Sequence, residues 1–272
     1  NITERGIRKM QKQTGHLTSA AAEQATERVI LKKAALTACS NGLPRQRAEQ
    51  IRKLIQILKE TGIETVYSPY LYEKEESPFS GTPRERARAL MEYYTDPTLD
   101  MILDVSGGDA ANGILPYLDF SIIRNSKAVF WGYSDLTTII NAIYTKTGKT
   151  SVLYQIKNLT DEKAGAQQRN AFRQLITAGT DNLFHFSARF LCGKEMEGIV
   201  VGGNMRCFLK LAGTEYWPDM NGKILLLEAS GGLAPQMASC LAQLNQIGVF
   251  RQIKGILLGT FLKMEESKSR PT

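Results

Sequence analysis

Short apolar runs alternate with helical patterns along the first half of the chain. The apolar runs, which are typical of buried strands, occupy residues 34–39, 64–69, 101–105 and 128–131. Between them, residues 46–60 place apolar side chains at helical spacing, and Thr82 with Glu85 forms the capping box of a second helix that ends near Tyr94. Strands that alternate with helices predict an α/β fold with a doubly wound, mostly parallel sheet.

The second half of the chain has a different pattern. After a helical stretch at about 164–175, strand-like runs occur at 198–204, 223–228 and 254–261, with one helix at 237–247. We therefore predict four parts: a polar N-terminal extension (1–33), an α/β domain (34–160), a linker region (161–195) and a smaller β-rich domain (196–272). We expect a cleft between the two domains. The charged end of the chain is expected to be flexible, and the second domain to be truncated.

Composition excludes several classes of protein. The chain has 272 residues, of which 43% are hydrophobic and 22% charged, with a net charge of +7, as in ordinary globular proteins. Basic residues form no stripe interleaved with aromatic residues, so we expect no nucleic-acid partner. No apolar run approaches the ~20 residues of a membrane span, so we expect no membrane partner.

The cysteines favour a reducing compartment. The four cysteines are widely separated and lack metal-ligand spacing: Cys39, Cys192, Cys207 and Cys240. We therefore expect free thiols, no bound metal and a cytoplasmic location. Cys39 has no basic neighbour, which favours a buried and inert thiol over a nucleophile.

Residues 106–116 (SGGDAANGILP) carry the strongest signal for chemistry. They follow a buried strand, and a strand followed by two glycines and a helix start is the layout of a nucleophile elbow or an anion-binding turn. In parallel sheets such loops lie at the carboxyl ends of strands, where 39–41 and 132–135 also lie. The position at which an elbow would carry serine is Ala111, which has no reactive atom.

These residues resemble a known family. The segments 106–108 and 112–119 resemble the nucleophile region of the LD-carboxypeptidase family of serine peptidases, which includes muramoyl-tetrapeptide carboxypeptidases and microcin C self-immunity proteins. Further matches follow in the family's order, at 38–41, 132–135, 202–204, 226–228 and 255–259. Together they cover about residues 34–264.

The resemblance implies a Ser–His–Glu triad and no cofactor. The serine falls on Ala111 and the glutamate on Glu228, which would close the cleft from the second domain. The histidine belongs to a loop beyond the last matched strand, where this chain ends; its two histidines, His16 and His185, lie in other contexts. Backbone N–H groups of Gly108 and Asn112 are the candidates for the oxyanion hole.

An intact form would hydrolyse an amide bond near a peptide carboxyl terminus through an acyl-enzyme. The resemblance implies muropeptides or microcin-like aminoacyl nucleotides as substrates, and a homodimer. Because alanine cannot be acylated, we predict that this chain is inactive as given. The alternative is a non-catalytic relative that binds a peptide or nucleotide-like ligand in the same cleft; the sequence leaves open whether the alanine is natural or introduced. A dinucleotide-binding domain is disfavoured because the third glycine is missing.

Residues near the loops have a structural and a functional interpretation. Asp109 would contact a ligand amine or simply be solvated, and Ser40 and Asn41 would line the cleft or form a turn. We predict that Ser134 and Asp135 form a helix N-cap.

Four residues of the second half and the linker complete the expectations. Asn204 is expected to brace the backbone that joins the domains, and His185 to be a partly buried structural residue. Arg206 and Lys210 are candidate binders of a carboxylate.

Overall fold

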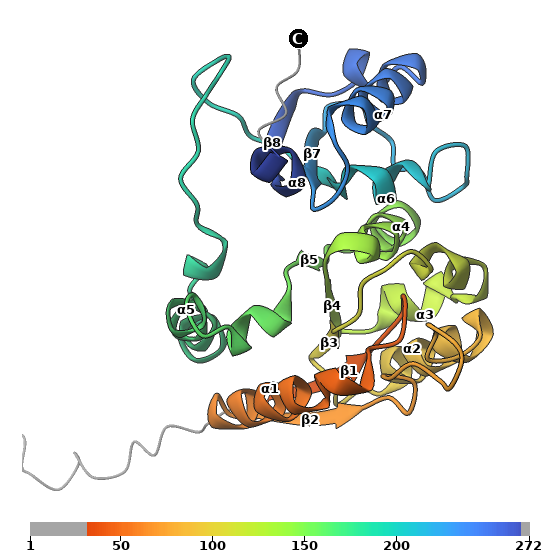
Figure 1. The fold of residues 1–272 in the computed structure, drawn as a ribbon, viewed down its shortest axis with the longest axis vertical. Coiled ribbons are helices and arrows are strands. Elements are labelled where there is room, and N and C mark those ends of the chain that lie inside the picture. The colour runs from red at the N-terminus through yellow and green to blue at the C-terminus, as the bar shows by residue number, and fades with distance from the viewer. Residues whose placement is uncertain (1–31, 268–272) are drawn as a thin grey trace, which may run out of the picture. The chain divides into compact units, whose positions relative to one another are not determined.

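The computed structural model describes residues 32–267 (Figure 1). Five parallel strands form the first sheet, in the order β2-β1-β3-β4-β5. They are β1 (Lys32–Thr37), β2 (Ile63–Tyr67), β3 (Met101–Asp104), β4 (Val129–Gly132) and β5 (Val152–Leu153). The predicted doubly wound parallel sheet is confirmed. β1 begins earlier than expected, inside the predicted extension, because Lys32 and Lys33 pair with Ile63 and Glu64 of β2.

Helices cover both faces of this sheet. One face packs against α1 (Ala48–Glu60), η4 (Ile156–Thr160) and α5 (Gly165–Ala178), and Leu36 and Leu103 point into this layer. The other face packs against α2 (Pro83–Thr95), η2 (Ala111–Tyr117), α3 (Phe120–Asn125) and α4 (Thr137–Thr147), and Ala35 and Ile102 point toward them. Neighbouring residues of a strand thus serve opposite layers, as the alternation of side chains requires.

Local sequence explains how α2 begins. The Thr82 hydroxyl accepts a hydrogen bond from the Glu85 N–H (3.2 Å), and the Glu85 carboxylate accepts one from the Thr82 N–H (2.7 Å). Pro83 occupies the first helical position, where its missing N–H costs nothing. The predicted capping box is confirmed.

A second parallel sheet, with the order β6-β7-β8, forms the C-terminal part. Its strands are β6 (Val200–Asn204), β7 (Ile224–Ala229) and β8 (Gly255–Phe261), and its helices are α6 (Met205–Leu209), α7 (Ala234–Gln246) and α8 (Leu262–Ser267). Leu225 and Leu227 pack with Phe208 of α6 and Leu244 of α7 in a separate core. Residues 262–267 form α8, and the residues beyond them lie outside the described part, so the flexibility of the charged end stays a prediction.

Short 3-10 helices and one long connection complete the chain. The short helices are η1 (Arg45–Arg47), η3 (Ser134–Leu136), η5 (Asn182–Phe184) and η6 (Val249–Arg251). Within the described chain, residues 185–199 run to β6 without a helix or strand. Helix α5, which lies inside the predicted linker, instead contributes Phe172 to the first core. The four domain boundaries stay a prediction, and the extension lies almost wholly outside the described residues.

Helix α4 joins the two sheets. The Asn141 amide donates to the Gly202 carbonyl (2.8 Å) and accepts from the Gly202 N–H (2.9 Å). The Thr137 hydroxyl accepts from the N–H of Asn204 (3.0 Å). These bonds satisfy the backbone of the glycine-rich strand β6, and they place the end of that strand beside the loop that follows β4.

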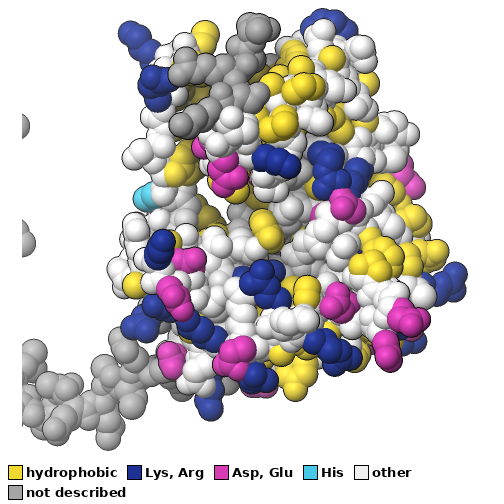
Figure 2. Space-filling view, viewed as in Figure 1, with side chains coloured by type: hydrophobic (Ala, Val, Ile, Leu, Met, Phe, Trp, Pro, Cys, Tyr) yellow, Lys and Arg dark blue, Asp and Glu magenta, His cyan; other side chains and the backbone are white. Residues whose placement is uncertain are grey.

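The described surface is of mixed charge. On the face that Figure 2 shows, Lys and Arg side chains are interleaved with Asp and Glu side chains. Among residues 32–267, no helix combines the length and the apolar character needed to cross a bilayer.

Candidate functional site

The loop between β3 and η2 is fixed by a buried carboxylate. Asp104, at the end of β3, accepts hydrogen bonds from the N–H of Cys39 (2.8 Å), the N–H of Ser106 (2.8 Å) and the hydroxyl of Ser106 (2.6 Å). Burial raises the pKa of Asp104, and the donors from Ser106 and Cys39 oppose that rise. The carboxylate thereby ties the loop after β1 to the loop after β3.

Gly108 adopts a conformation that other residues rarely adopt. Its φ is +134°, and a Cβ at this position would lie 2.3 Å from Cγ of Asn41. The Asn41 side chain also accepts a hydrogen bond from the Asp109 N–H (3.2 Å). The Asn41 side chain therefore packs against Gly108 and holds the glycine loop through a hydrogen bond. Its predicted contact with substrate stays a prediction.

Ala111 begins the 3-10 helix η2 and is fully buried. Its methyl group packs in the core that contains Ile114 and Leu115. Among the described non-glycine residues, positive φ angles occur only at Glu76 (58°) and Ser134 (54°). The backbone strain of a nucleophile elbow is therefore absent at Ala111.

Asp135 is the centre of the site, and its role was not predicted from the sequence. Its side chain is 0% exposed. It accepts hydrogen bonds from the Ser40 hydroxyl (2.7 Å), the Ala111 N–H (2.8 Å) and the Lys210 ammonium (2.5 Å). The predicted N-cap was wrong, since Tyr133 is the N-cap of η3 and Ser134 lies inside it. The available signal was an acidic residue in the loop that follows the buried parallel strand β4, where functional groups gather.

The C-terminal part of the chain supplies two cations to this network. Arg206 of α6 forms an ion pair with Asp109, and Lys210 donates to the Asp109 carbonyl (2.9 Å) as well as to Asp135. The predicted carboxylate binders therefore bind carboxylates of the chain itself. Ser40 is fully buried between Asp135 and the elbow, so its predicted contact with substrate stays a prediction that competes with this internal role.

Glu228 is the penultimate residue of β7 and lies beside Asn204, its register partner on β6. Burial raises the pKa of Glu228, and a hydrogen bond with Asn204 opposes the rise. Burial also raises the pKa of Tyr133, and the negative charge of Glu228 adds to the effect. The Tyr133 hydroxyl would lie 3.6 Å from a Cβ on Gly107, so Glu228 acts electrostatically on a group that borders the elbow.

Other candidate groups are inert or distant. Burial raises the pKa of the Cys39 thiol well above its usual range, in agreement with the prediction of an inert residue. The expectation for His185 was wrong: it is exposed, with Nε2 3.1 Å from the Asp181 carboxylate. His16 lies outside the described residues. Within residues 32–267, no cluster of three or more His, Cys, Asp or Glu side chains has the arrangement of a metal site.

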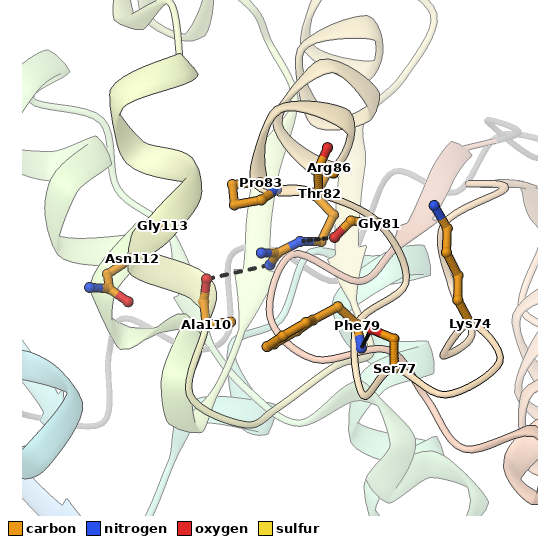
Figure 3. A pocket seen from close by; sticks show the side chains of 10 residues that line it. All are labelled: Lys74, Ser77, Phe79, Gly81, Thr82, Pro83, Arg86, Ala110, Asn112 and Gly113. Atoms are coloured by element: carbon orange, nitrogen blue, oxygen red, sulfur yellow. Dashed lines mark hydrogen bonds between the residues drawn. The ribbon is translucent and has the colours of Figure 1, made fainter.

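A cavity of about 450 Å³ lies on one side of the elbow (Figure 3). The side chains of Phe79 and Pro83 form apolar walls, and Asn112 stands at the elbow side. The buried Arg86 guanidinium donates to the carbonyls of Ser40 (2.8 Å), Gly81 (3.2 Å), Ala110 (3.4 Å) and Cys39. The dipoles of these backbone carbonyls thus stabilise the charge of Arg86, which lines the cavity.

A second cavity, of about 390 Å³, borders the elbow at Gly107. Both cavities are lined by the N-terminal part alone. The predicted cleft between the two domains stays a prediction.

Comparison with known proteins identifies both parts of the chain. The LD-carboxypeptidase N-terminal domain matches residues 34–154, and the LD-carboxypeptidase C-terminal domain matches residues 197–272. A probable murein peptide carboxypeptidase of Bacillus subtilis is 29% identical over 205 residues, which are 70% of this chain and 62% of that protein. The microcin self-immunity protein MccF of Escherichia coli is 27% identical over 225 residues, or 71% of this chain and 65% of that protein.

The fold is shared with a solved structure. The structure of MccF in complex with glutamyl sulfamoyl guanosine superposes with a TM-score of 0.72 at 20% identity, over 89% of this chain and 82% of that one. The matched region spans less than two thirds of the length of the two relatives named above. With both domains matched in order and the fold shared, the chain belongs to the LD-carboxypeptidase family.

Proposed function

We propose that this chain uses the peptidase fold to bind a peptide-like ligand without forming an acyl-enzyme. The observation that carries the proposal is Ala111, a buried methyl group where the family resemblance places the nucleophilic serine. Covalent catalysis at this position needs a hydroxyl or thiol, and a methyl group cannot supply one. An active member of the family would instead cleave an amide bond near a peptide carboxyl terminus.

The internal hydrogen bonds of the glycine loop support a binding role. Asp135 accepts the Ala111 N–H, and Asn41 accepts the Asp109 N–H, so the loop is held by the chain's own groups. Such a preorganised loop loses little conformational freedom when a ligand binds. In this proposal the N–H groups of Gly108 and Asn112 face the ligand, and Glu228 polarises the site through Tyr133.

Two ligand classes follow from the relatives. One relative is named a murein peptide carboxypeptidase, and MccF was solved with glutamyl sulfamoyl guanosine. We therefore propose muropeptides and aminoacyl-nucleotide conjugates as ligands. We also propose a cytoplasmic location and a homodimer. Sedimentation velocity measures the oligomeric state directly.

The test combines binding with turnover. Isothermal titration calorimetry measures the binding of an LD-linked muramoyl tetrapeptide and of glutamyl sulfamoyl guanosine, and mass spectrometry follows release of the terminal amino acid from the tetrapeptide. We expect binding of at least one compound and no release above the uncatalysed rate. Release of the terminal amino acid by the unaltered protein would overturn the proposal. So would a titration that detects binding of neither compound.

Ala111→Ser tests the mapping of the nucleophile, with Ala110→Ser as the matched control one residue away. We expect Ala111→Ser alone to change the affinity for the tetrapeptide in the same calorimetric assay, because only a hydroxyl at the nucleophile position would meet the amide bond of the ligand. Equal affinities of both variants and of the unaltered chain would show that residue 111 is not the nucleophile position.

A further inference from the structure

We propose that the second cavity, which borders Gly107, binds an anionic group, carboxylate or phosphate, through Arg47 and Lys157. This site goes beyond the elbow chemistry proposed above, since it needs neither a nucleophile nor turnover. A ligand held at the elbow would lie beside it, because Gly107 belongs to both.

The cavity lies where open parallel sheets bind ligands. The strand order β2-β1-β3-β4-β5 reverses direction between β1 and β3, and ligands bind outside the carboxyl ends of strands at such a switch point. The lining residues come from the segments that follow β1, β3, β4 and β5, including Leu43, Gly107, Tyr133 and Gln155.

Two cations reach this cavity without a carboxylate in contact. The Lys157 ammonium makes no hydrogen bond or ion pair within residues 32–267, and the only partner of the Arg47 guanidinium there is the Gln50 amide oxygen (3.4 Å). Burial lowers the pKa of Lys157, and the positive charge of Arg47 adds to the effect. A half-buried ammonium beside a second cation is unfavourable until an anion neutralises it.

The acidic groups nearby are already engaged. Asp161 stands at the mouth of the cavity, where its carboxylate accepts the N–H groups of Lys163 (2.8 Å) and Ala164 (2.7 Å). Asp104 lies beneath the elbow and opposes the fall in the Lys157 pKa, but it is buried among donors from Cys39 and Ser106. Neither forms an ion pair with Lys157.

A neutral side chain that lines the cavity indicates which chemical group the ligand would carry beside its anion. The side-chain oxygen of Gln155 is buried and has no hydrogen-bond partner within the described chain, while the Gln155 amide interacts with the Tyr133 hydroxyl and lowers its pKa. An unsatisfied buried acceptor favours an occupant that carries a donor. A carboxylate next to a peptide N–H, or a phosphate that keeps one proton, meets both requirements.

The experiment uses two small probes, inorganic phosphate and N-acetyl-D-alanine, titrated calorimetrically into the whole chain. We expect binding of at least one probe, weakened at least tenfold by Lys157→Met and severalfold by Arg47→Gln. Lys59→Met, on the exposed end of α1, serves as the control and should leave binding unchanged. Binding of phosphate alone identifies a phosphate ligand, and binding of N-acetyl-D-alanine alone identifies a peptide carboxylate.

A second readout covers the fold of the variants. Lys157→Met removes an unpaired, half-buried charge, so its melting temperature should match or exceed that of the unaltered chain, and the probes should no longer raise it. No binding of either probe, or equal binding by the unaltered chain and both cavity variants, would overturn the site. Because neither probe contains an LD-peptide bond, such a failure is distinct from a failure of the proposed elbow function.

Discussion

Replacing Asp135 with asparagine tests whether a buried ion pair holds the C-terminal part of the chain against the elbow. The substitution keeps the shape of the side chain but removes its charge. The Lys210 ammonium, whose side chain is 18% exposed, would then lose its charged partner at 2.5 Å, and the single amide oxygen of asparagine would be shared with Ser40 and the Ala111 N–H. Its other acceptors are the Asp109 backbone oxygen at 2.9 Å and the distant Asp109 carboxylate at 3.9 Å.

The expected loss follows from the burial of the pair. Removing one partner of a buried ion pair costs about 3–5 kcal/mol, because the other charge stays in a poorly solvated site. Since Lys210 keeps a backbone acceptor, we expect about 3 kcal/mol for Asp135→Asn. For a domain of this size that loss lowers the melting temperature by roughly 6–12 °C.

The measurement is urea unfolding followed by tryptophan fluorescence, with hydrogen exchange of the Ala111 amide as a local readout. Glu215→Gln is the matched control: its partner Lys146 is 2.6 Å away and also links α4 to the C-terminal part, but Glu215 is exposed. Exposed pairs contribute about 0–1 kcal/mol.

A double variant separates the ion pair from general damage. Asp135→Asn combined with Lys210→Met removes both charges, and it should be more stable than Asp135→Asn alone. A loss below about 1 kcal/mol for Asp135→Asn, or one no larger than that of the exposed control, would refute the reasoning.

Three further predictions address the surrounding residues. Gly108→Ala should lower the free energy of unfolding by about 3 kcal/mol or more, through strain at φ +134° and the clash with Asn41, whereas Gly148→Ala, with open space around it, should cost about 1 kcal/mol in the same urea assay. Glu228→Gln should stabilise the chain at pH 7 but not at pH 4. Because the pKa of Glu228 is raised in the folded state, its ionisation disfavours the folded state increasingly as the pH rises above 4.5. An equal change in stability at pH 4 and pH 7 would contradict this. Arg86→Lys should cost about 2 kcal/mol in thermal unfolding, because an ammonium cannot span the carbonyls of Ser40, Gly81 and Ala110 that the guanidinium bridges; a neutral effect would mean that those carbonyls find other donors.

Much of the fold was accessible from local sequence. Apolar periodicity located every strand of both sheets except the short β5, and the capping box at Thr82 located the start of α2, because burial and capping depend on neighbours in the sequence. The glycine-rich loop and Ala111 were singled out as well, since the motif that contains them is contiguous, and the nucleophile role of position 111 stays a prediction.

Local sequence patterns gave wrong predictions where the surroundings of a residue are set by segments distant in the sequence. The phenylalanines beside His185 suggested burial, yet residues 185–199 form no helix or strand and His185 is exposed. Ser134 resembled an N-cap, but Tyr133 occupies that position, and Ser134 is the first residue of η3 with a left-handed φ of 54°.

By itself, then, the sequence determined the fold class and the family resemblance, and it led to the prediction that Ala111 stands at the nucleophile position. Only the tertiary structure decided that Asp135 gathers Ser40, the Ala111 N–H and Lys210 around one buried carboxylate. Only it decided that Arg47 and Lys157 reach the same cavity. The physical reason is that ion pairing and charge burial depend on tertiary contacts between segments that are distant in the sequence. The periodicity of apolar residues along the chain does not specify those contacts.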